Sequence, residues 1–255
     1  MQAEPSVPKS DSLLAVEWDA PSCVGALWST RAGGHSAPPW DSLNLGDHVG
    51  DDPRAVSRNR QAFAAAVGCE VGWLRQVHGC VVVSAQSALD GPCTADGSWS
   101  AQPQVACAIL VADCLPVLLA ADNGRAVGAA HAGWRGLSQG VIEAVAVQVA
   151  QAADCPVRRL VAWLGPCIGP ERFEVGPEVV AAFGGGPAFR PSPGASRPDR
   201  FLADLALLAR ARLQRLGIGR VAGVGECTAS LPHRYYSYRR DGVTGRMAAA
   251  VWLRR

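Results

Sequence analysis

The 255-residue sequence contains a single lysine, Lys9, so arginine supplies nearly all of its positive charge. This scarcity excludes chemistry that needs a lysine elsewhere in the chain, such as a P-loop lysine or a Schiff-base lysine. Only five histidines are present, with no His-x-His pair, and no two of the nine cysteines form a Cys-x-x-Cys pair. A zinc ribbon and a thioredoxin-like redox motif are therefore excluded.

The sequence also lacks an excess of charge of one sign and an export signal. Its formal net charge is +2 and it has no dense basic run, which leaves no electrostatic footprint for nucleic acid. Residues 1–12 lack the basic start and apolar centre of a signal peptide, and we expect residues 1–20 to be a flexible segment. An odd number of cysteines without a signal peptide favours reduced thiols and a cytoplasmic protein.

Hydrophobic residues make up 49% of the chain, enough for a packed core, and we expect one domain over residues 21–255 and a monomer. The apolar run VACAILVADCLPVLLAA, residues 105–121, has nearly the length of a membrane span. Asp113 and Pro116 interrupt it, so it predicts two buried strands and no membrane contact.

Helical patterns occur between the apolar runs. Their capping residues and apolar spacing predict helices over residues 51–68, 137–153 and 201–217. The tail 235–253 predicts a strand, a tight turn at Asp241-Gly242 and a second strand. Strands and helices do not alternate strictly, so we expect an α/β fold of mixed type, with a mixed β-sheet covered by helices on both faces.

Three side chains that bind soft or borderline metals stand where predicted strands end: His78 in RQVHG, Cys114 in VADCLP and His131 in AAHAGWRG. A catalytic zinc needs three protein ligands and an open position, and ligand sites in α/β proteins gather at strand ends. The separations of 36 and 17 residues fit no short metal motif, so core packing is the alternative for each. Cys114 has another alternative, a nucleophile with a histidine as its base.

The turn that follows His131 predicts an anion site. Ala-Gly-Trp-Arg-Gly joins a strand to a helix, and the free N–H groups of a helix start favour an anion such as phosphate. Arg135 can add a forked contact, and Arg31 in the glycine-rich segment STRAGGHS is predicted to face the same pocket. The alternatives are a tight turn with a solvated Arg135, and a plain surface loop at Arg31.

Further polar side chains are flanked by apolar residues, and for these we predict contacts with substrate or phosphate, a structural hydrogen bond being the alternative: Asn44, Gln76 and Arg239. The remaining histidines lie in loops, and we expect them to be solvated: His35, His48 and His233.

Several of these stretches carry one recognisable pattern in the same order: STRAGGHS, SLNLGDHVGDDPRAVSRNR, QVHG, ADCLPVLL, HAGWRGL, GPCIGPERFEVG and SYRRDGVTGR. Together they resemble the YfiH family, whose members are also described as laccase-domain or polyphenol-oxidase proteins, purine nucleoside phosphorylases and peptidoglycan-editing factors. The resemblance runs from about Val24 to the C-terminus. It implies a three-layer α/β/α fold and a zinc or copper site formed by His78, Cys114 and His131. It also implies that these residues serve phosphorolysis of adenosine, inosine, guanosine and methylthioadenosine, and deamination of adenosine.

Three functions from different classes remain open. The first is a purine nucleoside phosphorylase with adenosine deaminase activity, which takes a purine nucleoside and phosphate. Its metal ion is Zn2+, with Cu2+ as the alternative. The second is a copper-dependent polyphenol oxidase; five histidines exclude the histidine-rich multicopper architecture, but one copper in a three-ligand site stays open. The third is a cysteine-dependent amide hydrolase that edits peptidoglycan precursors. We predict the first.

Overall fold

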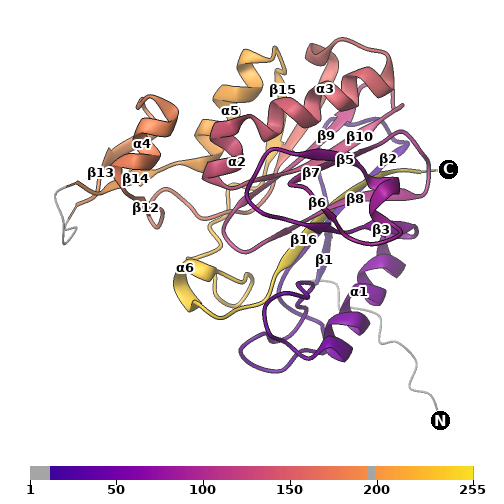
Figure 1. The fold of residues 1–255 in the computed structure, drawn as a ribbon, viewed down its shortest axis with the longest axis horizontal. Helices are drawn as coiled ribbons and strands as arrows, with labels where there is room; N and C mark the ends of the chain where they lie inside the picture. The colour runs from indigo at the N-terminus through magenta and orange to yellow at the C-terminus, as the bar shows by residue number, and fades with distance from the viewer. Residues whose placement is uncertain (1–11, 194–198, 255) are drawn as a thin grey trace.

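The computed structural model describes residues 12–193 and 199–254. Two mixed β-sheets run through its centre (Figure 1). The five-stranded sheet has the order β1 (Leu13–Ala15), β2 (Val24–Ser29), β16 (Met247–Leu253), β8 (Val105–Val111), β3 (Glu70–Gly72). The six-stranded sheet has the order β15 (Arg220–Gly223), β11 (Leu160–Leu164), β9 (Leu115–Ala121), β10 (Val127–Ala132), β7 (Gly97–Ser100), β5 (Val82–Ser84).

The two sheets pack face to face around a shared apolar core. Ile109 of β8 and Leu118 of β9 are fully buried in this core. Trp28 of β2 packs against Trp163 of β11 with ring centroids 6.5 Å apart, which joins one sheet to the other. Burial of such large aromatic side chains is a dominant contribution to core stability.

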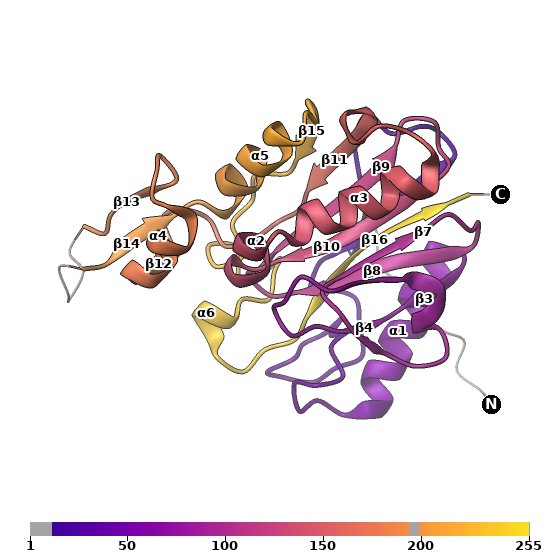
Figure 2. The same ribbon diagram turned by 45° about the horizontal axis from the view of Figure 1, so that its top comes forward.

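Helices cover the outer faces of the stacked sheets (Figures 1 and 2). The six-stranded sheet carries α2 (Trp134–Gln139), α3 (Val141–Ala153) and α5 (Leu205–Arg215), and the five-stranded sheet carries α1 (Pro53–Val67). The predicted mixed α/β class is confirmed. The β layer consists of two sheets, whereas one mixed sheet was expected. The sequence does not predict this division, because β8 and β9 are buried along their whole length and show no alternation that assigns each to a sheet.

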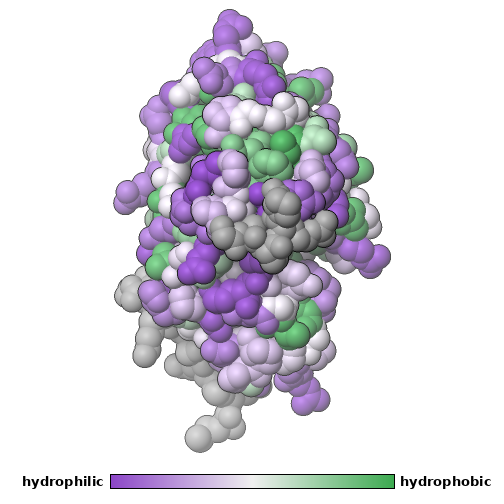
Figure 3. All heavy atoms as spheres, turned by 90° about the vertical axis from the view of Figure 1, so that its left-hand side faces the viewer, coloured by the Kyte–Doolittle hydropathy of each residue, from purple (hydrophilic) through white to green (hydrophobic). Residues whose placement is uncertain are grey.

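A smaller unit projects from one end of the stack (Figure 1, left). It contains β12 (Glu174–Val175), α4 (Pro177–Phe183), β13 (Phe189–Pro191) and β14 (Phe201–Ala203). On the face of the molecule at this end, hydrophobic side chains occur in small groups among hydrophilic ones (Figure 3). The remaining elements are β4 (Leu74–Arg75), β6 (Cys93–Thr94), α6 (Tyr238–Asp241) and the 3-10 turns Ala85–Ala88 and Val157–Arg159.

The predicted helices are present with altered limits. The Asp52 carboxylate caps α1 by accepting from the N–H of Arg54, and Gly68 ends the helix in the left-handed region. The stretch 137–153 is divided between α2 and α3, since Gly140 has a φ of 94°. In the stretch 201–217 the first three residues form β14, and α5 begins after its cap, Asp204.

The expectation for the C-terminal end is corrected, and part of the N-terminal segment forms a strand. The tail 235–253 does not form a hairpin: Tyr235 and Tyr236 are buried outside any strand, α6 follows, and only β16 is a strand. Within the segment expected to be flexible, residues 1–11 lie outside the described residues, whereas Leu13–Ala15 pair with β2 as strand β1. Among the described helices, none has both the length and the apolar character that a bilayer crossing requires.

Candidate functional site

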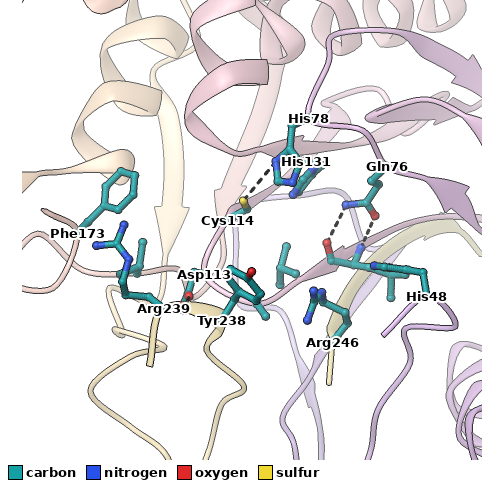
Figure 4. Close-up of a pocket in the computed structure, with 14 residues that line it drawn as sticks. His48, Gln76, His78, Asp113, Cys114, His131, Phe173, Tyr238, Arg239 and Arg246 are labelled. Carbon is teal, nitrogen blue, oxygen red and sulfur yellow. Dashed lines mark hydrogen bonds between the residues drawn. The ribbon is translucent and has the colours of Figure 1, made fainter. Parts of the chain in front are cut away.

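A cleft of about 480 Å³ opens at the end of the stack where β8 leaves one sheet and β9 enters the other (Figure 4). This volume lies within the range of small-molecule sites, ~300–1,000 Å³. The lining side chains come from distant parts of the chain: His48, Gln76, His78, Leu110, Val111, Ala112, Asp113, Cys114, His131, Ile168, Phe173, Tyr238, Arg239 and Arg246.

The three predicted metal ligands meet in this cleft. The ligand atoms of His78, Cys114 and His131 all lie within 4.8 Å of one another. The Sγ of Cys114 is 3.9 Å from the Nδ1 of His78, and the two imidazole rings are 4.8 Å apart between centroids. His78 and His131 are 53 positions apart in the sequence. They form one cluster with Cys114 because the loop after β4, the β8–β9 turn and the end of β10 lie together.

The turn that carries Cys114 is held by the residue before it. Asp113 has a φ of 94°, in the left-handed region that tight turns use. Its carboxylate accepts hydrogen bonds from the Thr228 hydroxyl at 2.6 Å and from the Arg239 N–H at 2.7 Å. These contacts tie the crossing between the two sheets to the C-terminal part of the chain and direct Cys114 toward the histidines.

A second carboxylate, missed in the sequence, lies behind the histidines. The side chain of Asp96 is fully buried; it accepts from the Nδ1 of His131 at 2.8 Å and from the N–H groups of Val77, His78 and Gly79. Burial acts to raise the pKa of Asp96, but the hydrogen bonds from His131 and Gly79 outweigh it and hold the pKa below its usual value. The signal available was an acidic residue in the apolar setting ADGSWS.

Cys114 and His131 perturb each other strongly. Burial alone raises the pKa of the Cys114 thiol, but the charge of His131 and the hydrogen bonds from both histidines lower it to about 6. Burial lowers the pKa of His131, and the Cys114 charge together with the Asp96 hydrogen bond raises it to about 9. Cys114 is therefore a thiolate near neutral pH, the form that binds metals and attacks electrophiles.

The glycines after His131 allow the chain to approach the cluster closely. A Cβ at Gly133 would lie 2.8 Å from the Sγ of Cys114 and 3.0 Å from the Nδ1 of His78. A Cβ at Gly136 would lie 2.5 Å from the carbonyl oxygen of Gly79. These glycines thus let α2 pack directly on the His78 loop, which accounts for their spacing in the HAGWRG segment.

The donor set fits a zinc ion or a similar borderline cation. Two imidazoles and one thiolate are ligands that zinc and copper accept, and three protein ligands leave a further position open. In a tetrahedral zinc site neighbouring ligand atoms are about 3.5 Å apart, given zinc–ligand bonds of about 2.0–2.3 Å. The 3.9 Å between Cys114 and His78 requires only a small contraction to reach that separation.

Two of the predicted substrate contacts line the cleft. The Gln76 amide is paired with the main chain of Leu110 in both directions, at 2.8 and 2.7 Å, so it fastens the His78 loop to β8. The Arg239 guanidinium lies over the ring of Phe173 and donates to the carbonyls of Arg172 and Glu174. Arg239 still borders the cavity, and Figure 4 shows it at the Phe173 end.

The other three predicted contacts lie outside the cleft. Arg31 forms an ion pair with Asp41 in a separate shallow depression, and Arg135 is exposed with its guanidinium over the ring of Trp134. Asn44 is fully buried, where its amide binds the main chain of Gly46 and Arg246 and the carboxylate of Asp51. Arg31 and Asn44 thus have polar partners within the fold, whereas Arg135 lies over the ring of its neighbour in the sequence.

Other cleft residues were missed. Arg246 lies in the SYRRDGVTGR segment between a glycine and an apolar residue, the same kind of setting that marked Arg239. Burial lowers the pKa of Arg246, and the charges of Cys114 and Asp113 act to raise it. His48, expected to be solvated, is more than half exposed but borders the cleft. Tyr238 also lines the cavity, and Figure 4 shows its ring beside Arg246.

Known proteins share this sequence and this fold. A family model described as multi-copper polyphenol oxidoreductase laccase matches residues 25–254. A Pseudomonas aeruginosa protein named purine nucleoside phosphorylase is 49% identical over 94% of this chain and 98% of its own length. An Escherichia coli protein named purine nucleoside phosphorylase YfiH is 45% identical over the same shares of the two chains.

Solved structures agree with these sequence matches. The crystal structure of a Neisseria meningitidis protein, 44% identical, superimposes with a TM-score of 0.88 over 96% of this chain and 100% of that one. The crystal structure of a Bacillus licheniformis protein named YfiH, 28% identical, gives a TM-score of 0.86. The ordered motifs, the stacked mixed sheets and these matches along nearly the whole chain show that the protein belongs to the YfiH family of laccase-domain proteins.

Proposed function

We propose that this protein is a zinc-dependent purine nucleoside phosphorylase that also deaminates adenosine. The observation that carries the proposal is the single cleft that holds both a thiolate–imidazole cluster and two arginines. Relatives that share almost half of its residues bear the name purine nucleoside phosphorylase, which supports a purine nucleoside and phosphate as its substrates. Its nine cysteines are all free thiols, which is compatible with work in a reducing cytoplasm.

Phosphorolysis needs a cationic group that holds phosphate, and Arg246 suits this task. One of its terminal nitrogens donates to the carbonyls of Thr244 and Gly245, and among the described residues no hydrogen bond uses the other. The guanidinium is fixed by these contacts and presents its remaining N–H groups to the cleft. Charge-assisted, forked hydrogen bonds of this kind are the usual arginine contacts with phosphate.

In the proposed reaction a phosphate oxygen bonds to the ribose C1′ as the bond from C1′ to the purine nitrogen breaks. The purine leaves with the bonding electrons and takes up a proton, so the products are the free base and ribose 1-phosphate. Arg246 and Arg239 hold the phosphate charge, and the rings of Tyr238 and Phe173 offer apolar contact to the nucleoside. We extend this to adenosine, inosine, guanosine and methylthioadenosine.

The deaminase activity is assigned to the cysteine–histidine end of the cleft. His78, Cys114 and His131 would hold the zinc. When bound by three protein ligands, zinc supplies a water whose pKa is near neutral. On the inner side of that position the chain buries His131, 4% exposed, and packs Gly133 against the cluster, while His78 is exposed on the open side.

Two alternatives have specific support. The lowered pKa of Cys114, with His78 at 3.9 Å, also suits a cysteine nucleophile and therefore an amide hydrolase. The family description supports a copper polyphenol oxidase. Against a multicopper site, all five histidines lie in the described residues, and the search of those residues found one cluster of potential ligands.

Product analysis separates these functions. The purified, metal-quantified protein is incubated with adenosine, with and without inorganic phosphate. Adenine and ribose 1-phosphate formed only with phosphate would support the phosphorylase, and inosine formed without phosphate would support the deaminase. Absence of any product from a zinc-loaded protein would contradict the proposal and favour the amide hydrolase.

A further inference from the structure

One buried carboxylate contacts the segments that carry both histidine ligands. The Oδ1 atom of Asp96 accepts from the Nδ1 of His131 at 2.8 Å and from the His78 N–H at 2.9 Å, and its Oδ2 atom accepts from the Gly79 N–H at 2.7 Å. We propose that Asp96 is the positioning residue that prepares His78 and His131 for a metal ion. The inference rests on the metal site of the proposed function and concerns binding of the ion, not turnover.

The contact with His131 selects which ring nitrogen is available. A carboxylate that accepts from Nδ1 keeps the proton on that atom and leaves the lone pair of Nε2 free. His131 is almost completely buried, so no bulk water competes for its Nδ1–H. Asp96 therefore fixes the protonated nitrogen of His131 on the side away from Cys114 and the cleft.

The contacts with the His78 loop fix the backbone. Three successive N–H groups, those of Val77, His78 and Gly79, point at the Asp96 carboxylate. His78 has a φ of 61°, a left-handed conformation that is uncommon for residues other than glycine. Convergent hydrogen bonds to a buried anion stabilise that conformation, and it directs the imidazole toward Cys114.

The main chain of Asp96 makes its own bonds, which a side-chain substitution leaves in place. Its N–H donates to the carbonyl of Val81 at 3.0 Å, and its carbonyl accepts from the His131 N–H at 2.7 Å. The Asp96→Asn variant keeps these bonds and the shape of the side chain. It replaces one carboxylate oxygen with an NH2 group that cannot accept. Replacement of Oδ1 removes the acceptor of His131 Nδ1 and the His78 N–H, and replacement of Oδ2 removes the acceptor of the Val77 and Gly79 N–H groups.

The test measures zinc affinity of the full chain by chelator competition, together with the absorption spectrum of the cobalt-substituted protein. We expect Asp96→Asn to bind zinc about 10–100-fold more weakly, the cost typical for loss of a partner of a metal ligand. Its cobalt spectrum should shift, because the two imidazoles no longer hold their positions. The matched control is Asp204→Asn, a carboxylate that caps α5 outside the cleft; its zinc affinity should equal that of the wild type.

A folded Asp96→Asn protein with wild-type affinity and cobalt spectrum would overturn the inference and leave the proposed function intact. Should this variant not fold, nitrogen-15 NMR of the zinc-loaded wild type decides. A proton on His131 Nδ1 with zinc on Nε2 supports the inference, and zinc on Nδ1 overturns it. A wild-type chain that binds no zinc would overturn both this inference and the metal-dependent part of the proposed function.

Discussion

At the scale of single residues, the site depends most on Cys114, the only thiolate in the cluster. We predict that Cys114→Ala binds zinc more than ~100-fold more weakly than the wild type. Removal of a residue that hydrogen-bonds to a metal ligand costs ~10–100-fold in affinity, and here a ligand itself is removed. Nucleoside turnover should fall with it. Zinc content after dialysis and the rate of product formation are the measurements. The Cys155→Ala variant, which removes a half-buried cysteine outside the cleft, is the control and should retain both.

Arginine substitutions distinguish the cleft from the turn that the sequence favoured for phosphate. Arg246→Ala should raise the KM for phosphate about 10–100-fold, since a charge-assisted hydrogen bond contributes about 1.5–3 kcal/mol. Its zinc content should be unchanged. Arg135→Ala should leave the phosphate KM at its wild-type value, because that guanidinium lies over Trp134 outside the cleft. The reverse pattern would return the anion site to the turn after His131.

Residue types in the sequence predict chemistry better than they predict partners. His78, Cys114 and His131 are predicted because each stands at the end of a predicted strand, and the structure brings the three side chains together. Asn44 and Gln76 have the same polar character, but main-chain groups far along the sequence occupy their amides. Nothing in the local pattern reveals such long-range hydrogen bonds. Asp96 and Arg246 do have a local signal, but only the fold brings them to this site.

At the scale of secondary structure, capping residues predict helix limits well only where no tertiary contact intervenes. Asp52 and Gly68 bound α1 as expected, whereas Gly140, also a residue type that ends helices, is predicted as part of one helix over 137–153 and in fact separates α2 from α3. The separate α2 lies directly on the His78 loop, where Gly136 approaches the carbonyl oxygen of Gly79. Local propensity does not contain that contact.

The close contact between the start of α2 and the ligands predicts that Gly133 tolerates no side chain. Gly133→Ala places a Cβ against Cys114 and His78, and overpacking of this kind costs about 1–3 kcal/mol. Zinc affinity should fall as well, because the thiolate and the imidazole are displaced. The matched control is Gly219→Ala, where an added Cβ meets no atom within 4 Å. Urea unfolding of the metal-free proteins and zinc competition provide the two measurements; equal behaviour of the two variants would contradict the packing account.

At the scale of the whole molecule, the site lies where the chain passes from one sheet to the other. Strand β16 from the C-terminal end pairs with β2 and β8, and β8 is followed through Cys114 by β9 of the other sheet. Strands β8 and β9 are buried on both faces, so their sequences do not show that they belong to different sheets. The α/β class could therefore be predicted, but not the two stacked sheets. The same stacking brings distant loops to one cleft.

Because the three predicted ligands come from separate segments that only the folded chain brings together, metal binding should stabilise the whole protein. A ligand that binds only the native state at 100 times its Kd contributes about 2.7 kcal/mol. For a chain of this size each kcal/mol shifts the Tm by about 2–4 °C, so zinc at that concentration should raise the Tm by about 5–10 °C. Thermal unfolding with and without zinc, in wild type and Cys114→Ala, measures this. An equal zinc-dependent rise of the Tm in Cys114→Ala would show that the ion binds elsewhere. A rise of the Tm in the wild type alone would show that zinc stabilises the protein from the site between β8 and β9.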